Sequence, residues 1–335
     1  MFKKIVIGVI VLGVIALAGW KIFFSGGDVS TTIEKRKEEL VAYHMESTME
    51  IEANDSQKKY LVVTDYQKKD NFDNFRVSLT DTGVNQEQII IRNKDGVFVL
   101  TPLLNQVYKF KSDWPTNSPK PYLYHTILDS FEGKHEIKKM DDGIIVTTNP
   151  NYKNNPTWIK QDTKLNKNLE PTYINIYDAK NEAIVKINFT KVDLSPKFED
   201  THFDVKATME ESRSTMSITT SIEEVELPFY PTGANMSAIK KEETTSKIGD
   251  TEVVILVYEG DDAFTVIQSL VEPSEEMVIS EIDGEIESVL TGVAYSKNNY
   301  LVYVEGMVKY QIYAKDMPTS QKLEVAQGME ESIMK

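Results

Sequence analysis

The four histidines are the side chains best suited to bind a metal or to move protons near neutral pH. His44, His125, His135 and His202 are scattered through the chain, with no HExxH motif and no pair at i and i+4. A local metal site needs ligands that return to one face of a helix or one side of a turn. A lone histidine is far more often a surface or hydrogen-bonded residue, so the sequence predicts no metal centre.

Adjacent carboxylates can supply a general acid and a general base. Three such pairs are Asp141-Asp142, Asp261-Asp262 and Glu275-Glu276. They stand beside Gly, Ala and Pro-Ser, in polar turns where carboxylates are usually solvated. The chain has no GxSxG, no GxxxxGK[ST], no GxGxxG after a predicted strand and no cysteine. We therefore expect no enzymatic activity, no cofactor and no thiol chemistry.

The chain is strongly acidic. It has 37 Lys and Arg against 52 Asp and Glu, a formal net charge of −15. A nucleic-acid partner is disfavoured, because phosphate backbones need a basic footprint. Three basic residues precede Asp28, and the remainder carries a net charge of −18 that anionic lipid headgroups repel at close range.

The first 27 residues predict a membrane anchor. An apolar run from Ile5 to Phe24 is interrupted only by glycines and Lys21, and it follows Lys3 and Lys4. As a helix it would rise about 30 Å, enough to span a hydrocarbon core, and the paired lysines would stay in the cytoplasm. We expect a single-pass protein of the cell membrane with the rest of the chain extracytoplasmic.

Cleavage of this segment is the alternative. Residues 16–18 (Ala-Leu-Ala) resemble a signal-peptidase site, and cleavage there would release the chain. Residues 17–19 (Leu-Ala-Gly) resemble the start of a lipobox, but Trp20 stands where the lipid-modified cysteine is required. The apolar run continues beyond both sites to Phe24, which favours the uncleaved anchor.

Residues 28–209 predict a domain dominated by short strands. Residues 29–40 favour a short amphipathic helix with Ser30 or Thr31 as N-cap. The pattern then changes to period two, with Asp95-Gly96 as a hairpin turn, which predicts an antiparallel meander. Its six runs are MESTMEIEA, KKYLVVTDY, FRVSLTD, EQIIIRN, GVFVLTP and QVYKFK.

A second helix is predicted over residues 122–131. Leu123, Ile127 and Phe131 form one apolar stripe, which must lie on the sheet. Further strand patterns follow, and by residue 193 the sequence predicts about eleven strands and two helices. This content indicates one large curved sheet with helices covering one side, in an α+β fold class.

The C-terminal part is predicted to be a separate module. Residues 210–245 are rich in Ser, Thr, Glu and Lys, which is typical of a linker. Residues 246–335 predict a small α+β domain with a helix in AFTVIQSLVE and a final helix over 319–333. From Lys241 onward there are 7 basic and 19 acidic residues, a net charge of −12.

Several features between residues 28 and 206 recur in one known superfamily. They are the stretch DGVFVLTPLLNQVYKF, Trp158, Asp162, Leu169, Pro171, the hairpin of residues 173–189 and Phe203. With them the chain resembles the LolA-like lipoprotein-carrier superfamily. The resemblance implies a half-open antiparallel β-barrel covered by helices, whose apolar interior holds acyl chains.

The C-terminal run GMVKYQIYAKDMPTSQKLEVAQGMEESI resembles a DUF4367-type domain. A LolA-like domain followed by a smaller α+β domain is also the plan of the RseB/MucB regulators of envelope stress signalling. Lipoproteins linked to sporulation and germination share that plan. The resemblance therefore implies either lipid binding or signalling, whereas the predicted anchor departs from a carrier that must diffuse.

A sheet that curves around a lumen needs large apolar side chains on its concave side. Alternate residues face opposite ways, so about half of each strand can line the lumen. Packing of a helix onto the sheet is the alternative role for any one of them, and the resemblance favours the lumen for the group. The candidate ligand-binding residues are Ile89, Ile91, Val97, Val99, Leu104, Val107, Ile145, Trp158, Ile174 and Ile176.

Two hypotheses follow for the function. The first is a membrane-anchored, extracytoplasmic, non-catalytic protein that binds a lipid or lipoprotein acyl chain, at about 0.8 kcal/mol per buried methylene. The second is a regulatory or scaffold protein of envelope signalling or sporulation, whose acidic C-terminal domain binds a basic face of another exported protein. An enzyme acting on peptidoglycan or lipid has less support, because the sequence holds no catalytic constellation.

Overall fold

The computed structural model describes most of the chain between Val29 and Glu331. The described ranges are 29–53, 56–83, 85–114, 120–150, 152, 155–216, 225–232, 237–287, 289, 293–297 and 299–331. The predicted membrane anchor at residues 1–27 lies outside these ranges. Within them, no helix is both long and apolar enough to cross a membrane.

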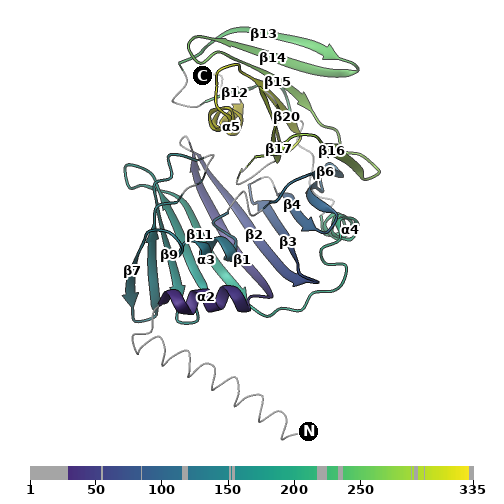
Figure 1. Cartoon of the computed structure of the whole chain (residues 1–335). Helices are drawn as coiled ribbons and strands as arrows, with labels where there is room; N and C mark the ends of the chain where they lie inside the picture. The colour runs from purple at the N-terminus through teal and green to yellow at the C-terminus, as the bar shows by residue number, and fades with distance from the viewer. Residues whose placement is uncertain are drawn as a thin grey trace, which may run out of the picture.

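A twelve-stranded sheet forms the first module (Figure 1). Two antiparallel meanders, β1 to β6 and β7 to β11, lie side by side through the pairing of β1 with β11. The sequence therefore predicted the strands of this module correctly, including the turn at Gly96, whose φ is +139°. The strands are β1 (Ala42–Ala53), β2 (Ser56–Lys69), β3 (Phe72–Asp81), β4 (Gln86–Asn93), β5 (Gly96–Thr101), β6 (Gln106–Phe110), β7 (His135–Met140), β8 (Gly143–Thr148), β9 (Lys160–Asn166), β10 (Pro171–Tyr177) and β11 (Ala183–Asp193).

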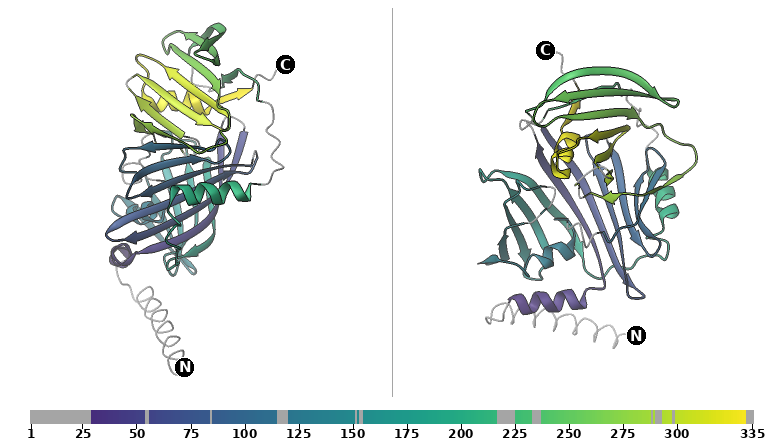
Figure 2. Two further views of the ribbon diagram at one scale, coloured as in Figure 1. Left: turned by 90° about the vertical axis from the view of Figure 1, so that its right-hand side faces the viewer. Right: turned by 45° about the horizontal axis from the view of Figure 1, so that its top comes forward.

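The sheet is curved and open. Its edges are β7 and, from the C-terminal module, β16 (Val278–Ile282), so the described strands form a trough and not a closed barrel. Figure 2 shows the two halves of the sheet turned toward each other around one face. We call this the inner face, which carries Tyr43, Val77 and Ile174, and the opposite one the outer face.

Two helices cover one end of the inner face. Helix α2 (Val29–Glu39) buries Ile33, and helix α3 (Tyr124–Asp129) buries Tyr124, Ile127 and Leu128. An ion pair of 2.6 Å between Lys37 Nζ and Asp129 Oδ1 joins the two helices. The predicted helix over 122–131 is thus present but shorter, because its first residues and its last form turns that pack their side chains on the same face.

The outer face is covered in part by helix α4 (Val205–Thr215). Asp204 caps it by accepting a hydrogen bond of 2.8 Å from the Ala207 amide. Met209 packs from this helix onto Ile89, Ile91 and other residues of β4 to β6. The stretch expected to be a linker, 210–245, therefore includes half of this helix, all of strand β12 (Phe229–Pro231) and most of strand β13 (Ile239–Ile248).

The second module is a seven-stranded antiparallel sheet with a helix on one face, and it stands at one end of the trough (Figure 1). Its strand order is β13-β14-β15-β20-β19-β18-β17, and β12 pairs separately with β21. The elements are β12 (Phe229–Pro231), β13 (Ile239–Ile248), β14 (Thr251–Glu259), β15 (Phe264–Leu270), β17 (Glu285–Ile286), β18 (Val293–Lys297), β19 (Tyr300–Glu305), β20 (Val308–Tyr313), α5 (Thr319–Gln327) and β21 (Met329–Glu331).

Two sequence predictions for this module were wrong. AFTVIQSLVE forms strand β15 and not a helix, because Phe264, Val266 and Gln268 alternate inward between β14 and β20. The helical spacing of its apolar residues was outweighed by pairing on both sides. The final helix ends at Gln327 instead of continuing to residue 333, since Met329 to Glu331 pair with β12.

The two modules are joined by a strand exchange that no local pattern predicted. Strand β16 leaves the second module and pairs in parallel with β6, the edge of the first meander. The side chain of Asn105 fixes the crossing by donating to the carbonyls of Ser274 at 3.1 Å and Glu275 at 3.0 Å. Val302 and Val304 of β19 join the core of the first module. The second module therefore acts as a cover for one end of the inner face.

Candidate functional site

The structure separates the predicted lumen residues between the two faces of the sheet. Six belong to the core of the inner face: Val97, Val99, Leu104, Trp158, Ile174 and Ile176. Ile89, Ile91 and Val107 pack on the outer face beneath α4. Ile145 is half-buried, and its neighbours Ile144 and Val146 are the ones that enter the inner core. The residues separate in this way because successive side chains of a strand point to opposite faces of the sheet.

The inner face beneath residues 120–131 is filled with the chain's own side chains. Tyr122, Leu123, Ile127 and Leu128 are each 0% exposed, and Trp114 is 1% exposed. This packing leaves the predicted lumen without space at that end. A ligand would have to displace a closely packed core there, at a cost of several kcal/mol.

His125 lies within this filled region. Its ring centroid is 4.4 Å from that of Tyr66 and 5.4 Å from that of Phe75. Burial lowers the pKa of His125 to about 4, so the ring is neutral at physiological pH. It therefore contributes to packing without a charge.

A cavity of about 310 Å³ opens at the other end, between the first sheet and the second module. We call it the junction cavity. Strands β2 to β4 and the turn between β5 and β6 form one wall, and β19, β20 and the β12/β21 pair form the other. Its apolar lining residues are Tyr60, Leu79, Leu103, Leu104, Val225, Phe229, Val304, Met307, Val308, Tyr310 and Met329. Leu104 is the one candidate from the sequence that borders it.

Polar groups surround the rim of the junction cavity. Lys58 Nζ of β2 lies 3.2 Å from Glu305 Oε1 of β19, so an ion pair joins the two walls. Gly306 forms the turn between β19 and β20 with a φ of +59°. Glycine adopts this conformation without strain, and the Gln86 side chain of β4 lies against the turn.

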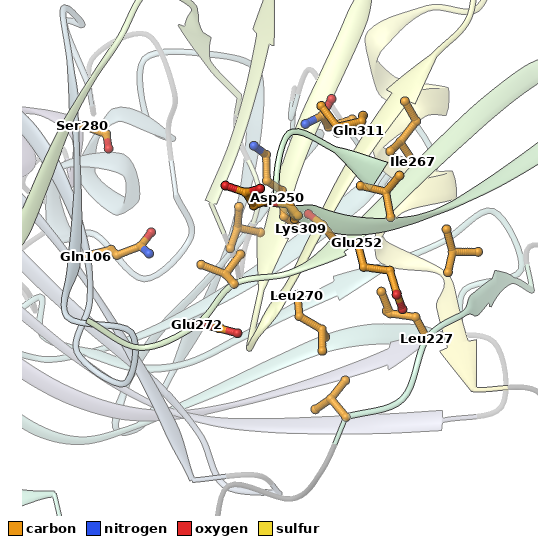
Figure 3. Close-up of a pocket in the computed structure, with 18 of the residues that line it drawn as sticks. Gln106, Leu227, Asp250, Glu252, Ile267, Leu270, Glu272, Ser280, Lys309 and Gln311 are labelled. Carbon is orange, nitrogen blue, oxygen red and sulfur yellow. The ribbon is translucent and has the colours of Figure 1, made fainter. Parts of the chain in front are cut away.

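A second hollow of about 1100 Å³ lies on the other side of Val304. We call it the acidic groove, because the exposed carboxylates Glu226, Asp250, Glu252 and Glu272 stand on its lining. Figure 3 shows Lys309 within it, and burial lowers the pKa of this lysine. The groove shares Val225 and Val304 with the junction cavity. The second module thus separates an apolar cavity from an acidic one.

Two histidines meet at one buried carboxylate on the outer face. Asp65 Oδ1 lies 2.6 Å from His44 Nδ1, and Asp65 Oδ2 lies 2.8 Å from His202 Nε2. The hydrogen bond to Asp65 raises the pKa of His44. Burial opposes ionisation of Asp65, but the two histidines keep the pKa of its carboxyl below the usual value. The arrangement holds the segment that leads from β11 to α4 against the sheet.

The part of the chain that the structure describes contains no cluster of side chains suited to bind a metal ion. No three His, Cys, Asp or Glu side chains there are grouped so as to hold an ion. The residues that line the junction cavity were mostly missed from the sequence. Phe229, Met307 and Met329 come from the second module, and no local pattern signals that their side chains face the first sheet.

Comparison with known proteins gives distant similarity. The sequence matches no known protein-family profile. It is 25% identical over 338 residues to YdcC, a sporulation protein of Bacillus subtilis strain 168, with 98% of this chain and 96% of that relative covered. The resemblance of the C-terminal part to a DUF4367-type domain stays a prediction.

The solved structures that align with this chain are also distant. The MucA/MucB complex of Pseudomonas aeruginosa aligns with a TM-score of 0.33 at 10% identity, over 90% of this chain and 99% of that one. An outer-membrane lipoprotein-sorting protein domain from Vibrio parahaemolyticus aligns with a TM-score of 0.32 at 14% identity, over 54% of this chain and 96% of that one.

Proposed function

We propose that this chain is a non-catalytic, extracytoplasmic binding protein that holds an acyl chain of a lipid or lipoprotein in the junction cavity, close to the membrane that the predicted anchor enters. The observation that carries the proposal is the cavity itself, about 310 Å³ of space walled mainly by apolar side chains from both modules. That volume lies at the lower end of the range for small-molecule sites.

The hydrophobic effect can supply the affinity without a charged or catalytic group. Each methylene buried in the cavity contributes about 0.8 kcal/mol. The ion pair of Lys58 with Glu305 lies at the rim, where a polar headgroup would remain in water. The site proposed here differs from the predicted lumen, because helix α3 and its flanking turns occupy that part of the trough.

We propose the biological process in which the protein acts from its similarity to YdcC. Similarity to a sporulation protein extends over nearly the whole chain. This supports a role during sporulation, in which a tethered protein senses or holds a lipid at the outer side of a membrane.

A cavity-filling variant tests the acyl site. Leu103 is half-buried on the cavity wall, so Leu103→Trp should fill the space and lower the occupancy of acyl ligand by about tenfold, equivalent to 1.4 kcal/mol. Leu61→Trp is the matched control, since Leu61 is 50% exposed and does not line the cavity. Native mass spectrometry of the full chain would count the bound lipid. Equal occupancy in both variants, or an empty wild type, would contradict the proposal.

A second candidate function is binding of a basic protein partner through the acidic groove. It is favoured by the four carboxylates of the groove and by the net charge of −12 of the C-terminal part. Deletion of the second module is a poor test, because it also removes β16 and three buried valines of the shared core, Val293, Val302 and Val304. Glu252→Lys with Glu272→Lys should instead abolish a salt-sensitive capture of the partner. Capture that survives both reversals would exclude the groove.

A further inference from the structure

Strand β13 is the outermost strand of the second sheet, and none of the strands that the structure describes pairs with its outer edge. Its ten residues, Ile239 to Ile248, are all exposed. Figures 1 and 2 place it on the side of the second module that faces away from the first sheet. A long edge strand with unpaired backbone groups can accept a further strand. The sequence of β13 and the directions of its backbone groups determine which strand it can accept.

The turn after β13 determines which backbone groups face outward. Gly249 and Asp250 form a two-residue turn, with Gly249 at a φ of +61°, and Ile248 pairs with Thr251. In such a hairpin the residues that flank the turn exchange both hydrogen bonds, and the bonded pairs alternate along the strand. Glu243, Thr245 and Lys247 are therefore the residues whose N–H and C=O groups point away from β14.

We propose that β13 pairs antiparallel with β13 of a second copy of this chain, about a two-fold axis that passes beside Thr245. The axis places Thr245 opposite Thr245 of the second copy and Glu243 opposite Lys247 of the second copy. Thr244 lies opposite Ser246 on the other face. Threonine and serine pairs and opposite charges are both favourable across antiparallel strands.

This register of the β13 pair is more favourable than the two neighbouring registers. A shift of two residues in one direction brings Lys241 opposite Lys247, and a shift in the other direction leaves Glu243 beyond the last residue of the partner strand. The pairing of β13 with β14 is irregular between Lys240 and Glu242, so the regular edge begins there and ends at the turn. This edge would exchange about six backbone hydrogen bonds with its copy.

Glu243 is already positioned by its own chain. Its Oε2 atom accepts hydrogen bonds from Tyr230 at 2.9 Å and from Lys240 at 2.8 Å. The Oε1 atom has no part in these two contacts. The pairing with Lys247 of a second copy would therefore add to the existing contacts without replacing them.

Cross-linking tests the pairing directly, because the chain contains no cysteine. The full-length variant Thr245→Cys, in its membrane, would be treated with a short bismaleimide. We expect a covalent dimer. The matched control is Leu61→Cys, at a residue that is 50% exposed on the outer face of the first sheet. A dimer yield for Thr245→Cys no higher than for Leu61→Cys would overturn the proposal.

Charge reversal tests the register. In the Thr245→Cys background, Lys247→Glu opposes two carboxylates across the axis and should lower the dimer yield at least about fivefold, a free energy of about 1 kcal/mol. Glu243→Lys should do the same by opposing two lysines. Co-expression of the two variants, distinguished by size tags, should restore a mixed dimer, because every charge then meets its opposite. Cross-linking that ignores the reversals, or no rescue on mixing, would disprove this register.

Discussion

The two ends of the inner face differ in what covers them. At the α3 end, Tyr122, Leu123 and Ile127 come from the segment between β6 and β7 and are fully buried against the sheet. At the other end, the cover is the β19–β20 hairpin of a separate module, and about 310 Å³ stays empty. The sheet supplies large apolar residues at both ends. The cavity therefore arises from the fit between modules and not from the composition of the strands.

This difference explains why the site is placed at the junction. A contiguous helix can be matched to its sheet residue by residue, with interior packing density as the result. The second module is held by the β16 strand, the Asn105 hydrogen bonds, the Lys58 ion pair and the packing of a few valines such as Val302 and Val304. These contacts fix its position at the edge and leave the space between them open.

Truncation at the filled end should have the largest effect. Ile127→Ala removes a side chain that is 0% exposed and should lower the free energy of unfolding by about 2–5 kcal/mol. Leu103→Ala only enlarges an existing cavity and should cost about 1 kcal/mol or less. Urea unfolding followed by tryptophan fluorescence would measure both. Equal losses would remove the distinction between the two ends.

Lys120 provides a pH test of the contact between the modules. It is 3% exposed, its Nζ donates to the Val289 carbonyl, and burial lowers its pKa to about 7. In the unfolded chain the pKa of a lysine is about 10.4. Between about pH 7 and pH 10 the unfolded chain therefore keeps a proton on Lys120 that the folded chain has lost. The free energy of unfolding should therefore rise from about pH 7 to about pH 10, and Lys120→Met should flatten that rise. An unchanged slope in the variant would mean that Lys120 is not buried in this way.

A substitution on the outer face should have the smallest effect on the free energy of unfolding. The pKa of His44 is raised by its hydrogen bond to Asp65, so its stabilisation is present below the unfolded pKa of about 6.5 and is lost as pH rises through the folded value. His44→Gln should lower the free energy of unfolding by about 1 kcal/mol at acidic pH and by less in alkaline solution. Acyl binding should not change. A larger loss at alkaline pH would reverse the assigned sign.

Sequence patterns located strands β1 to β11 and helices α2 and α3 of the first module, but not helix α4, half of which was assigned to a linker. Period-two runs and the Asp95-Gly96 turn located its strands, and the stripe of Leu123, Ile127 and Phe131 located its inner helix. These signals are local, because strand alternation and helix periodicity are properties of short segments. The same locality misled the prediction for AFTVIQSLVE, where pairing with distant strands decided the structure.

The site could not be derived in the same way. Leu104 was named among the candidates, but Phe229, Met307 and Met329 border the cavity only because β16 docks the second module onto β6. A parallel pairing between residues far apart in sequence has no local signal. Strand alternation also left the side of Ile89 and Ile91 undetermined until α4 was seen to cover them.

Photolabelling would locate the proposed acyl site. A palmitoyl probe with a diazirine on its chain would be bound to the purified protein and irradiated, and the labelled peptides would be identified by mass spectrometry. We expect labels around Leu103, Phe229 and Met329, on the walls of the junction cavity. Labels confined to the segment around Tyr124 and Ile127, or to residues outside the cavity, would contradict it.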